Sequence, residues 1–158
     1  MHTINFENLD KRYSDIGMMH PDLQWLVESI LIDCDKYNLP FVLFETGRTI
    51  ARQQKLLGLK RSKTLKSKHL ITKDSIYSFA CDFVLFYIKN DKNIYSWAST
   101  EDEKQNAIDM AHYKMLSDLV MTKYPILLKD TNIKKIISGG QWRFFKDWPH
   151  YEFVLKDL

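Results

Sequence analysis

Two histidines and two aspartates, widely separated in the chain, carry side chains suited to metal-dependent hydrolysis. His69 and His150 supply imidazoles, and Asp82 supplies a carboxylate. Zinc sites that hydrolyse peptides use three protein ligands and keep a fourth position for water, which the metal acidifies. A further carboxylate must then accept the proton of that water, and Asp147 stands three residues before His150. Together these residue types are typical of a hydrolytic zinc site.

Each of these residues also has an ordinary structural explanation. Asp82 lies in the apolar run "FACDFVLF", where a buried carboxylate costs on the order of several kcal/mol unless it is paired, so a salt bridge is one alternative. A loop histidine among lysines, such as His69, is usually solvated. His150 stands where a last strand begins, a common place for histidine. The chain contains neither an HExxH motif nor a cysteine-rich cluster, and spacing alone leaves these alternatives open.

The step between Asp147 and His150 is stiff. Pro149 fixes its own φ angle and biases Trp148 toward an extended backbone. Such a spacer would hold Asp147 close to a metal without allowing it to become a ligand. A simple turn before the last strand is the alternative.

The length and composition of the chain favour a single globular domain. The chain has 158 residues, 45% hydrophobic content and a formal net charge of +3, which predicts a single catalytic domain over 1–158 without a separate wall-binding module. Cys34 and Cys81 show no disulfide or CxxC pattern. The apolar runs are too short to span a bilayer and the first residues contain no secretory signal, so we expect synthesis in the cytoplasm and no membrane insertion.

Hydrophobic periodicity predicts an α+β fold, with a small, largely antiparallel sheet and flanking helices. Pro125 is expected to end the longest helix near residue 124, and Thr100 with Glu103 is expected to form its capping box. Residues 59–78 are expected to be mostly loop. The expected helices are 20–38, 49–58 and about 100–124. The expected strands are 40–45, 79–88, 94–98 and 150–155, together with 134–140, which is expected to be a strand followed by a glycine turn.

An ordered set of short motifs extends this interpretation. "HPDLQWLV", "ETGRTIARQQKLL", "KTLKSKH", "ACDF", "GGQW" and "DWPHYEF" resemble, in that order, the zinc L-alanyl-D-glutamate peptidases of phage endolysins and the related VanY-like D-alanyl-D-alanine carboxypeptidases. The resemblance covers roughly residues 18–155. It implies a Hedgehog/DD-peptidase-like fold with the zinc site at the sheet.

The resemblance also implies roles for individual residues. The family pattern S-x-H, G-x-A-x-D and D/E-x-x-H makes His69, Asp82 and His150 the Zn²⁺ ligands and Asp147 the general base and acid. Arg48 would meet a substrate carboxylate or the oxyanion, a task that suits a guanidinium, although a surface ion pair is the alternative.

Four further residues are candidates for supporting roles. Ser67 would orient a ligand or the substrate, and Glu152 would support the ligands or compete with Asp147 as the base. Trp142 and Trp148 would wall the cleft, unless both are simply core residues.

Two features depart from the family pattern. Twelve residues separate His69 from Asp82, where the family has six, and Ser78 replaces an expected glycine. The difference predicts an inserted loop at the rim of the site. The basic run 60–68, with five cations in nine residues, is either a solvated loop or an attractor for acidic wall components.

The resemblance therefore predicts a monomeric endolysin that cuts the L-Ala–D-Glu bond of the peptidoglycan stem peptide after release from the host cytoplasm. The alternatives are a D,D-carboxypeptidase or dipeptidase with the same zinc site, and a catalytically inactive relative that binds zinc or wall peptides. A nucleic-acid binder is disfavoured, since no recognition motif accompanies the lysines.

Overall fold

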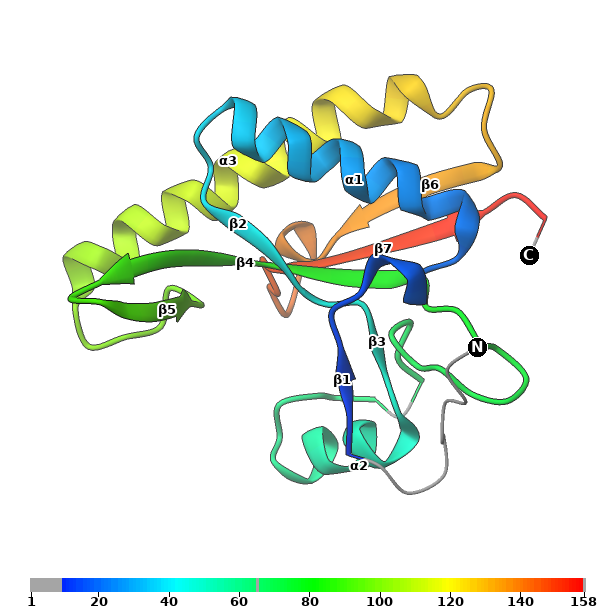
Figure 1. Ribbon diagram of the computed structural model, residues 1–158, viewed down its shortest axis with the longest axis horizontal. Coiled ribbons are helices and arrows are strands. Elements are labelled where there is room, and N and C mark those ends of the chain that lie inside the picture. The colour runs from blue at the N-terminus through cyan, green and yellow to red at the C-terminus, as the bar shows by residue number, and fades with distance from the viewer. Residues whose placement is uncertain (1–9, 65, 158) are drawn as a thin grey trace.

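The computed structural model describes residues 10–64 and 66–157, and its centre is a five-stranded antiparallel sheet (Figure 1). Strand β4 is the longest and pairs with three others. Its first residues pair with β7, its last residues pair with β5, and β2 lies along its other edge. β6 completes the sheet beyond β7. The strands are β2 (Phe41–Glu45), β4 (Ala80–Lys89), β5 (Lys92–Ser96), β6 (Ile133–Ser138) and β7 (His150–Leu155).

Two long helices cover one face of this sheet (Figure 1). The apolar stripe of α1 (Pro21–Lys36) packs with the buried side of α3 (Glu103–Leu127) and with the sheet side chains below them. Phe83 and Leu85 of β4 point into this core. Because side chains alternate along a strand, Asp82 lies on the opposite face of β4. One face of the sheet therefore packs against the core, and we call the opposite face, which carries Asp82, the polar face.

Both ends of α3 differ from the prediction. Asp102, rather than Thr100, is the N-cap, and its carboxylate accepts from the N–H of Gln105 at 3.0 Å, while Thr100 bonds to Asn106. Pro125 lies inside the helix, which ends at Leu127. A proline this close to the end costs little, because it removes only one of the last helical hydrogen bonds.

The β4–β5 hairpin is the predicted one, with a tighter turn. Strand β5 begins at Lys92, where the prediction placed the strand at 94. Asn90 and Asp91 form the turn with φ angles of 51° and 58°, the left-handed region that two-residue hairpin loops require and that these residue types tolerate.

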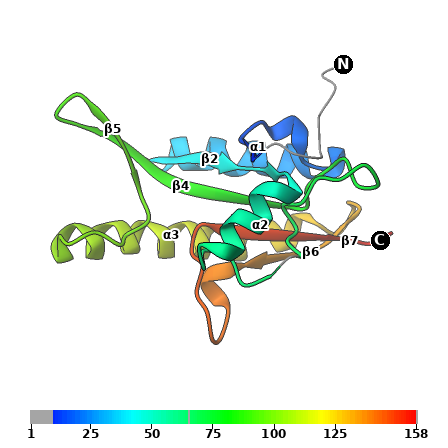
Figure 2. The ribbon, with the colours of Figure 1, turned by 90° about the horizontal axis from the view of Figure 1, so that it is seen from below.

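A smaller layer covers part of the opposite face of the sheet (Figures 1 and 2). It contains helix α2 (Ile50–Gly58) and a two-stranded sheet of β1 (Arg12–Tyr13) with β3 (Gly47–Arg48), a pairing that the sequence analysis missed. Short 3-10 turns η1 (Ile16–Met18) and η2 (Gly139–Gln141) complete the elements. Among the described residues, no helix has both the length and the apolar character to cross a membrane.

Candidate metal centre and active-site cavity

His69, Asp82 and His150 converge on one point at the polar face of the sheet. Asp82 Oδ1 lies 3.0 Å from His150 Nδ1 and 3.2 Å from His69 Nε2, and the two imidazole nitrogens are 3.1 Å apart. Both histidines are buried, while Asp82 is half-buried. Three residues that are distant in the sequence thus present one ligand atom each to a common centre.

The sheet register places two of the three residues. Asp82 and His150 are direct antiparallel partners across β4 and β7, so their side chains emerge on the same face next to each other. The N–H of Phe83 donates to the carbonyl of Pro149 at 2.9 Å, which fixes the start of β7 against β4.

A separate hydrogen-bonded segment delivers His69. Its carbonyl accepts from the N–H of Arg48 at 2.9 Å, and the N–H of Ile71 donates to the carbonyl of Arg48 at 3.0 Å. The N–H of Phe79 donates to the carbonyl of Lys68 at 2.9 Å. This last bond closes the intervening segment at its base, so the long spacing between His69 and Asp82 is accommodated as a loop.

The outward-facing nitrogens of both imidazoles have acceptors. His69 Nδ1 lies 3.4 Å from the carbonyl oxygen of Thr46, and His150 Nε2 lies 3.0 Å from Glu152 Oε1. If each outward nitrogen carries the proton, His69 Nε2 and His150 Nδ1 are both free to act as ligands. Such outer acceptors are the usual way in which proteins orient metal-binding histidines.

The donor set fits a zinc ion. Two imidazole nitrogens and one carboxylate oxygen are preferred zinc ligands, and tetrahedral bonds of about 2.0–2.1 Å put neighbouring ligand atoms about 3.3–3.4 Å apart. The observed separations of 3.0, 3.1 and 3.2 Å are close to that spacing. Electrostatics agree, because burial opposes ionisation of Asp82 but both histidines outweigh it and hold its pKa well below the ordinary value.

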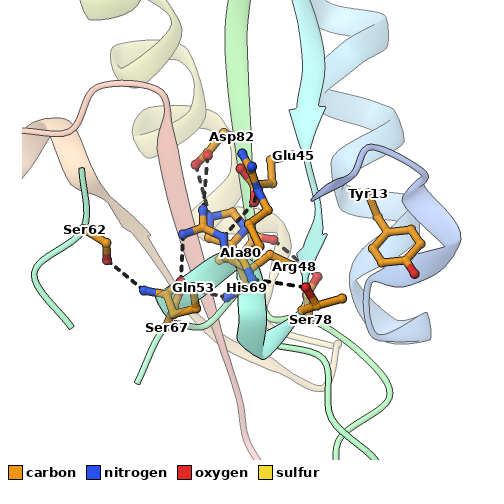
Figure 3. Close-up of polar contacts among 12 residues, drawn as sticks. Tyr13, Glu45, Arg48, Gln53, Ser62, Ser67, His69, Ser78, Ala80 and Asp82 are labelled. Atoms are coloured by element: carbon orange, nitrogen blue, oxygen red, sulfur yellow. Dashed lines mark hydrogen bonds and ion pairs between the residues drawn. The ribbon is translucent and has the colours of Figure 1, made fainter. Parts of the chain in front are cut away.

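Arg48 joins this centre to the smaller layer (Figure 3). Its side chain is only 8% exposed. Its Nε donates to Glu45 Oε1 at 2.7 Å, its Nη1 donates to Gln53 Oε1 at 2.9 Å, and its Nη2 lies 3.9 Å from Asp82 Oδ2. The ion pair of the alternative interpretation is present, with Glu45, but it is buried rather than at the surface, and it holds the guanidinium beside a candidate ligand.

Glu45 and Gln53 were not predicted as site residues. Within helix α2, which the structure describes in full, Gln53 is the one buried residue, and its Nε2 donates to Ser62 Oγ at 2.8 Å. The motif "ETGRTIARQQKLL" contains both residues, but nothing in the sequence indicated that they would be buried.

Asp147 approaches the centre on a tight turn. Its N–H donates to the carbonyl of Gly139 at 3.0 Å, and its own carbonyl accepts from the N–H of His150 at 3.1 Å. A methyl group on Gly139 would lie 2.3 Å from the carbonyl oxygen of Asp147, so glycine permits this approach. Burial, followed by the charge of Asp82, raises the pKa of Asp147.

Of the four candidates for supporting roles, three lie beside the candidate ligands or the cavity and one lies against the core. Ser67 Oγ accepts from the N–H of His69 at 3.2 Å, and Glu152 accepts from His150. The Trp142 ring lies 5.3 Å from the His150 ring and lines the cavity. Trp148 instead packs its ring against Gly140 and the edge of the core, so it corresponds to the alternative of a core residue.

The three candidate ligands, Arg48 and Asp147 line a cavity of about 780 Å³. Its wall contains both cationic and aromatic side chains. The cations are Arg48, Arg52, Lys60, Arg61, Lys63 and Lys66, and the aromatic residues are Phe44, Trp97, Trp142 and Phe145. The cavity thus combines a candidate metal centre with surfaces suited to an anionic, partly apolar ligand.

Comparison with solved structures shows a similar fold. The chain resembles the crystal structure of the Serratia marcescens L-Ala D-Glu endopeptidase ChiX, with a TM-score of 0.61 and 23% sequence identity over 99% of this chain and 96% of that chain. No protein-family model matches the chain, and no curated protein matches it in sequence. The α+β architecture expected from the sequence is thereby supported as a shared fold.

Proposed function

We propose that this protein is a zinc-dependent peptidoglycan endopeptidase that hydrolyses the L-alanyl-D-glutamate bond of the stem peptide. The convergence of His69, Asp82 and His150 in a cavity that also receives Asp147 carries the proposal. The likeness in fold to an L-Ala D-Glu endopeptidase supports the choice of bond.

The three ligand side chains would hold Zn²⁺ through His69 Nε2, Asp82 Oδ1 and His150 Nδ1. When bound, zinc supplies Lewis-acid polarisation of the scissile carbonyl and acidification of a water molecule. Thr46 and Glu152 keep the two imidazoles in the ligating tautomer.

Asp147 is the proposed proton shuttle. Its raised pKa suits a carboxylate that must accept a proton and then release it to the leaving amine. Glu152 is less suited to this task, since the hydrogen bond from His150 holds its pKa below the ordinary value and commits it to that histidine. The turn from 147 to 150 holds the proposed proton shuttle, Asp147, next to the proposed ligand, His150, while each keeps its own role.

Arg48 is the proposed electrostatic partner of the substrate. Glu45 and Gln53 fix two edges of its guanidinium, and Nη2 is directed toward Asp82 at the cavity. A positive charge prepositioned there would stabilise a substrate carboxylate or the negative charge that develops on the carbonyl oxygen.

We place this activity in phage-mediated lysis, with the enzyme made in the host cytoplasm and acting as a monomer on the wall after release. The basis is the resemblance of the ordered motifs to endolysin peptidases. The cationic part of the cavity wall suits the carboxylates of an acidic stem peptide.

Digestion of purified peptidoglycan tests the proposal. Mass analysis should find products with a new D-Glu amino terminus and glycan that retains L-Ala, and these products should be absent with Asp147→Asn. Release of terminal D-Ala alone would assign the protein as a carboxypeptidase. Zinc binding without any cleavage would make it an inactive relative.

A further inference from the structure

An exposed cluster of aromatic rings lies beside the cavity on the polar face of the sheet. Phe44, Tyr95 and Trp97 form this cluster, which we call the aromatic platform. The Phe44 ring centroid is 5.5 Å from that of Tyr95 and 5.1 Å from that of Trp97. Tyr95 is 45% exposed and Trp97 is 46% exposed. Phe44 lies on β2, Tyr95 lies on β5 in the projecting β4–β5 hairpin (Figures 1 and 2), and Trp97 directly follows β5.

The platform is held rigidly by its neighbours. The Arg12 guanidinium lies 3.7 Å from the centroid of Phe44, a cation–π contact, and Phe86 packs against Tyr95 with ring centroids 5.2 Å apart. Single exposed aromatic residues are common, but rings that contact one another at the surface form a patch, and such patches mark binding sites. Prearranged rings also lose little conformational entropy when a ligand binds.

The platform is continuous with the candidate active site. Phe44 and Trp97 line the same cavity as Asp82 and His150. Phe86, which supports Tyr95, lies four residues after Asp82 on β4 and therefore on the same face of the sheet. A ligand that fills the cavity at the metal centre could extend directly onto these rings.

We infer that the aromatic platform binds a sugar ring of the glycan strand that carries the stem peptide. This inference rests on the proposed function and extends it to a second part of the substrate. A pyranose ring has an apolar C–H face and a rim of hydroxyl and amide groups. Aromatic rings with polar tips, as in Tyr95 and Trp97, match that amphipathic character.

The proposed bond cleavage explains why a sugar would reach the platform. L-Ala is the stem-peptide residue joined to the glycan, so the sugar is separated from the scissile bond by one residue and its linking group. One extended residue spans at most about 3.6 Å. A D-Ala–D-Ala bond lies three residues farther away, about 10 Å. Because Phe44 and Trp97 line the cavity that holds the candidate ligands, a sugar next to the scissile bond could reach the platform.

A comparison of two substrates tests the inference. The kcat/KM value for a disaccharide-linked stem peptide is divided by the value for the same peptide without sugar. In the wild type this ratio should be about ten, the size of one aromatic contact, and Tyr95→Ala or Trp97→Ala should lower it to about one. Tyr37→Ala is the matched control, because Tyr37 is 49% exposed and lies at the C-cap of α1, across the sheet. A ratio unchanged in both platform variants would overturn the inference.

A binding experiment separates this inference from the proposed function. A trimer of N-acetylglucosamine should shift the indole N–H resonance of Trp97, and Tyr95→Ala should weaken that shift. If this happens while the wild type hydrolyses neither substrate, the saccharide site stands and the peptidase function fails. If both substrates are cut equally and the trimer shifts nothing, the saccharide site is wrong and the peptidase stands. Binding to phosphatidylglycerol vesicles that Tyr95→Ala abolishes would reassign the platform to a membrane surface.

Discussion

The backbone N–H of Arg48 donates a hydrogen bond to the carbonyl of His69 at 2.9 Å. The same arginine directs its guanidinium toward Asp82. One residue of β3 therefore positions the main chain of one candidate ligand and the charge beside another. Ile71 completes the connection by donating to the carbonyl of Arg48. This explains how a ligand on a long loop can be held as firmly as ligands on strands.

This connection predicts that the segment after Ile71 is dispensable for metal binding. Replacing residues 72–76 with the dipeptide Gly-Ser should leave zinc affinity unchanged within about twofold. The free energy of unfolding should change by less than about 1 kcal/mol, since shortening a closed loop costs little. Isothermal titration with zinc provides the measurement. Gly47→Ala is the contrasting variant, because its methyl group would lie 2.1 Å from Ile71 Cδ1 and would disturb the segment that carries His69. Loss of zinc binding in the loop replacement would contradict the prediction.

Zinc should stabilise the folded protein through His69, Asp82 and His150. At a free zinc concentration 100 times Kd, the stabilisation is about 2.7 kcal/mol, which corresponds to a rise in Tm of roughly 5–10 °C for a chain of this size. His69→Ala and His150→Ala should abolish the zinc-dependent rise, whereas His112→Ala on α3 should retain it. Thermal unfolding with zinc and with chelator measures the difference. An equal rise in all three variants would place the metal elsewhere.

Substitutions at Asp147 and at Glu152 should affect different properties, the first catalysis and the second metal binding. Asp147→Asn should lower kcat by about 10²- to 10⁴-fold while zinc affinity stays near that of the wild type, because the side chain moves protons and does not ligate. Glu152→Gln should instead weaken zinc binding by about 10- to 100-fold, because its carboxylate accepts from His150. Peptide hydrolysis and zinc titration of both variants distinguish these roles, and the opposite pattern would make Glu152 the base.

Gly140 should be intolerant of a side chain. A methyl group there would lie 2.2 Å from Cε3 of Trp148, so Gly140→Ala should destabilise the fold by about 1–3 kcal/mol. Gly58→Ala is the matched control, since no heavy atom lies within 4 Å of its added methyl group and the change should be neutral or stabilising by up to about 1 kcal/mol. Urea unfolding of the two variants gives the comparison. Similar stability of both would show that Trp148 moves aside freely.

Low pH should remove the contribution of the Asp33 carboxylate to the stability of the fold. Burial opposes the charge on Asp33, but hydrogen bonds from Lys123 and Tyr124 outweigh it and hold the pKa of Asp33 below the ordinary 3.8. A lowered folded-state pKa stabilises the protein above the unfolded value, and that stability is lost as pH falls through the folded value. Asp33→Asn should therefore be less stable than the wild type at pH 7, and the gap should narrow below pH 3.8.

Urea unfolding at several pH values measures this gap. Asp35→Asn, on the exposed side of the same helix, serves as the control. A gap that widens as the pH falls would contradict the assignment of Asp33.

Much of the fold could be predicted because its elements carry local patterns. The apolar stripe of α1, the run of β4 and the turn at Asn90 each follow from neighbouring residues, and the structure confirms them. The residues proposed to form the site were also visible as chemical types in order along the chain. Their individual roles remain predictions that the variants above would test.

Other features depended on contacts between distant segments. The β1–β3 pairing, the closure of the loop between Lys68 and Phe79, and the burial of Gln53 have no local signature. The end of α3 shows the same limit, since Pro125 predicts an end near residue 124 and the helix continues to Leu127.

The sequence by itself determined which residue types are available for hydrolysis and which segments form the long helices and the strands of the main sheet, because both depend on side chains close together in the chain. Only the tertiary structure decided that His69, Asp82 and His150 share one centre, that Arg48 is buried beside it, and that Trp148 supports the core while Trp97 faces the cavity. The physical reason is that strand register and long-range hydrogen bonds set these positions, and their energy comes from pairing residues that the sequence keeps far apart.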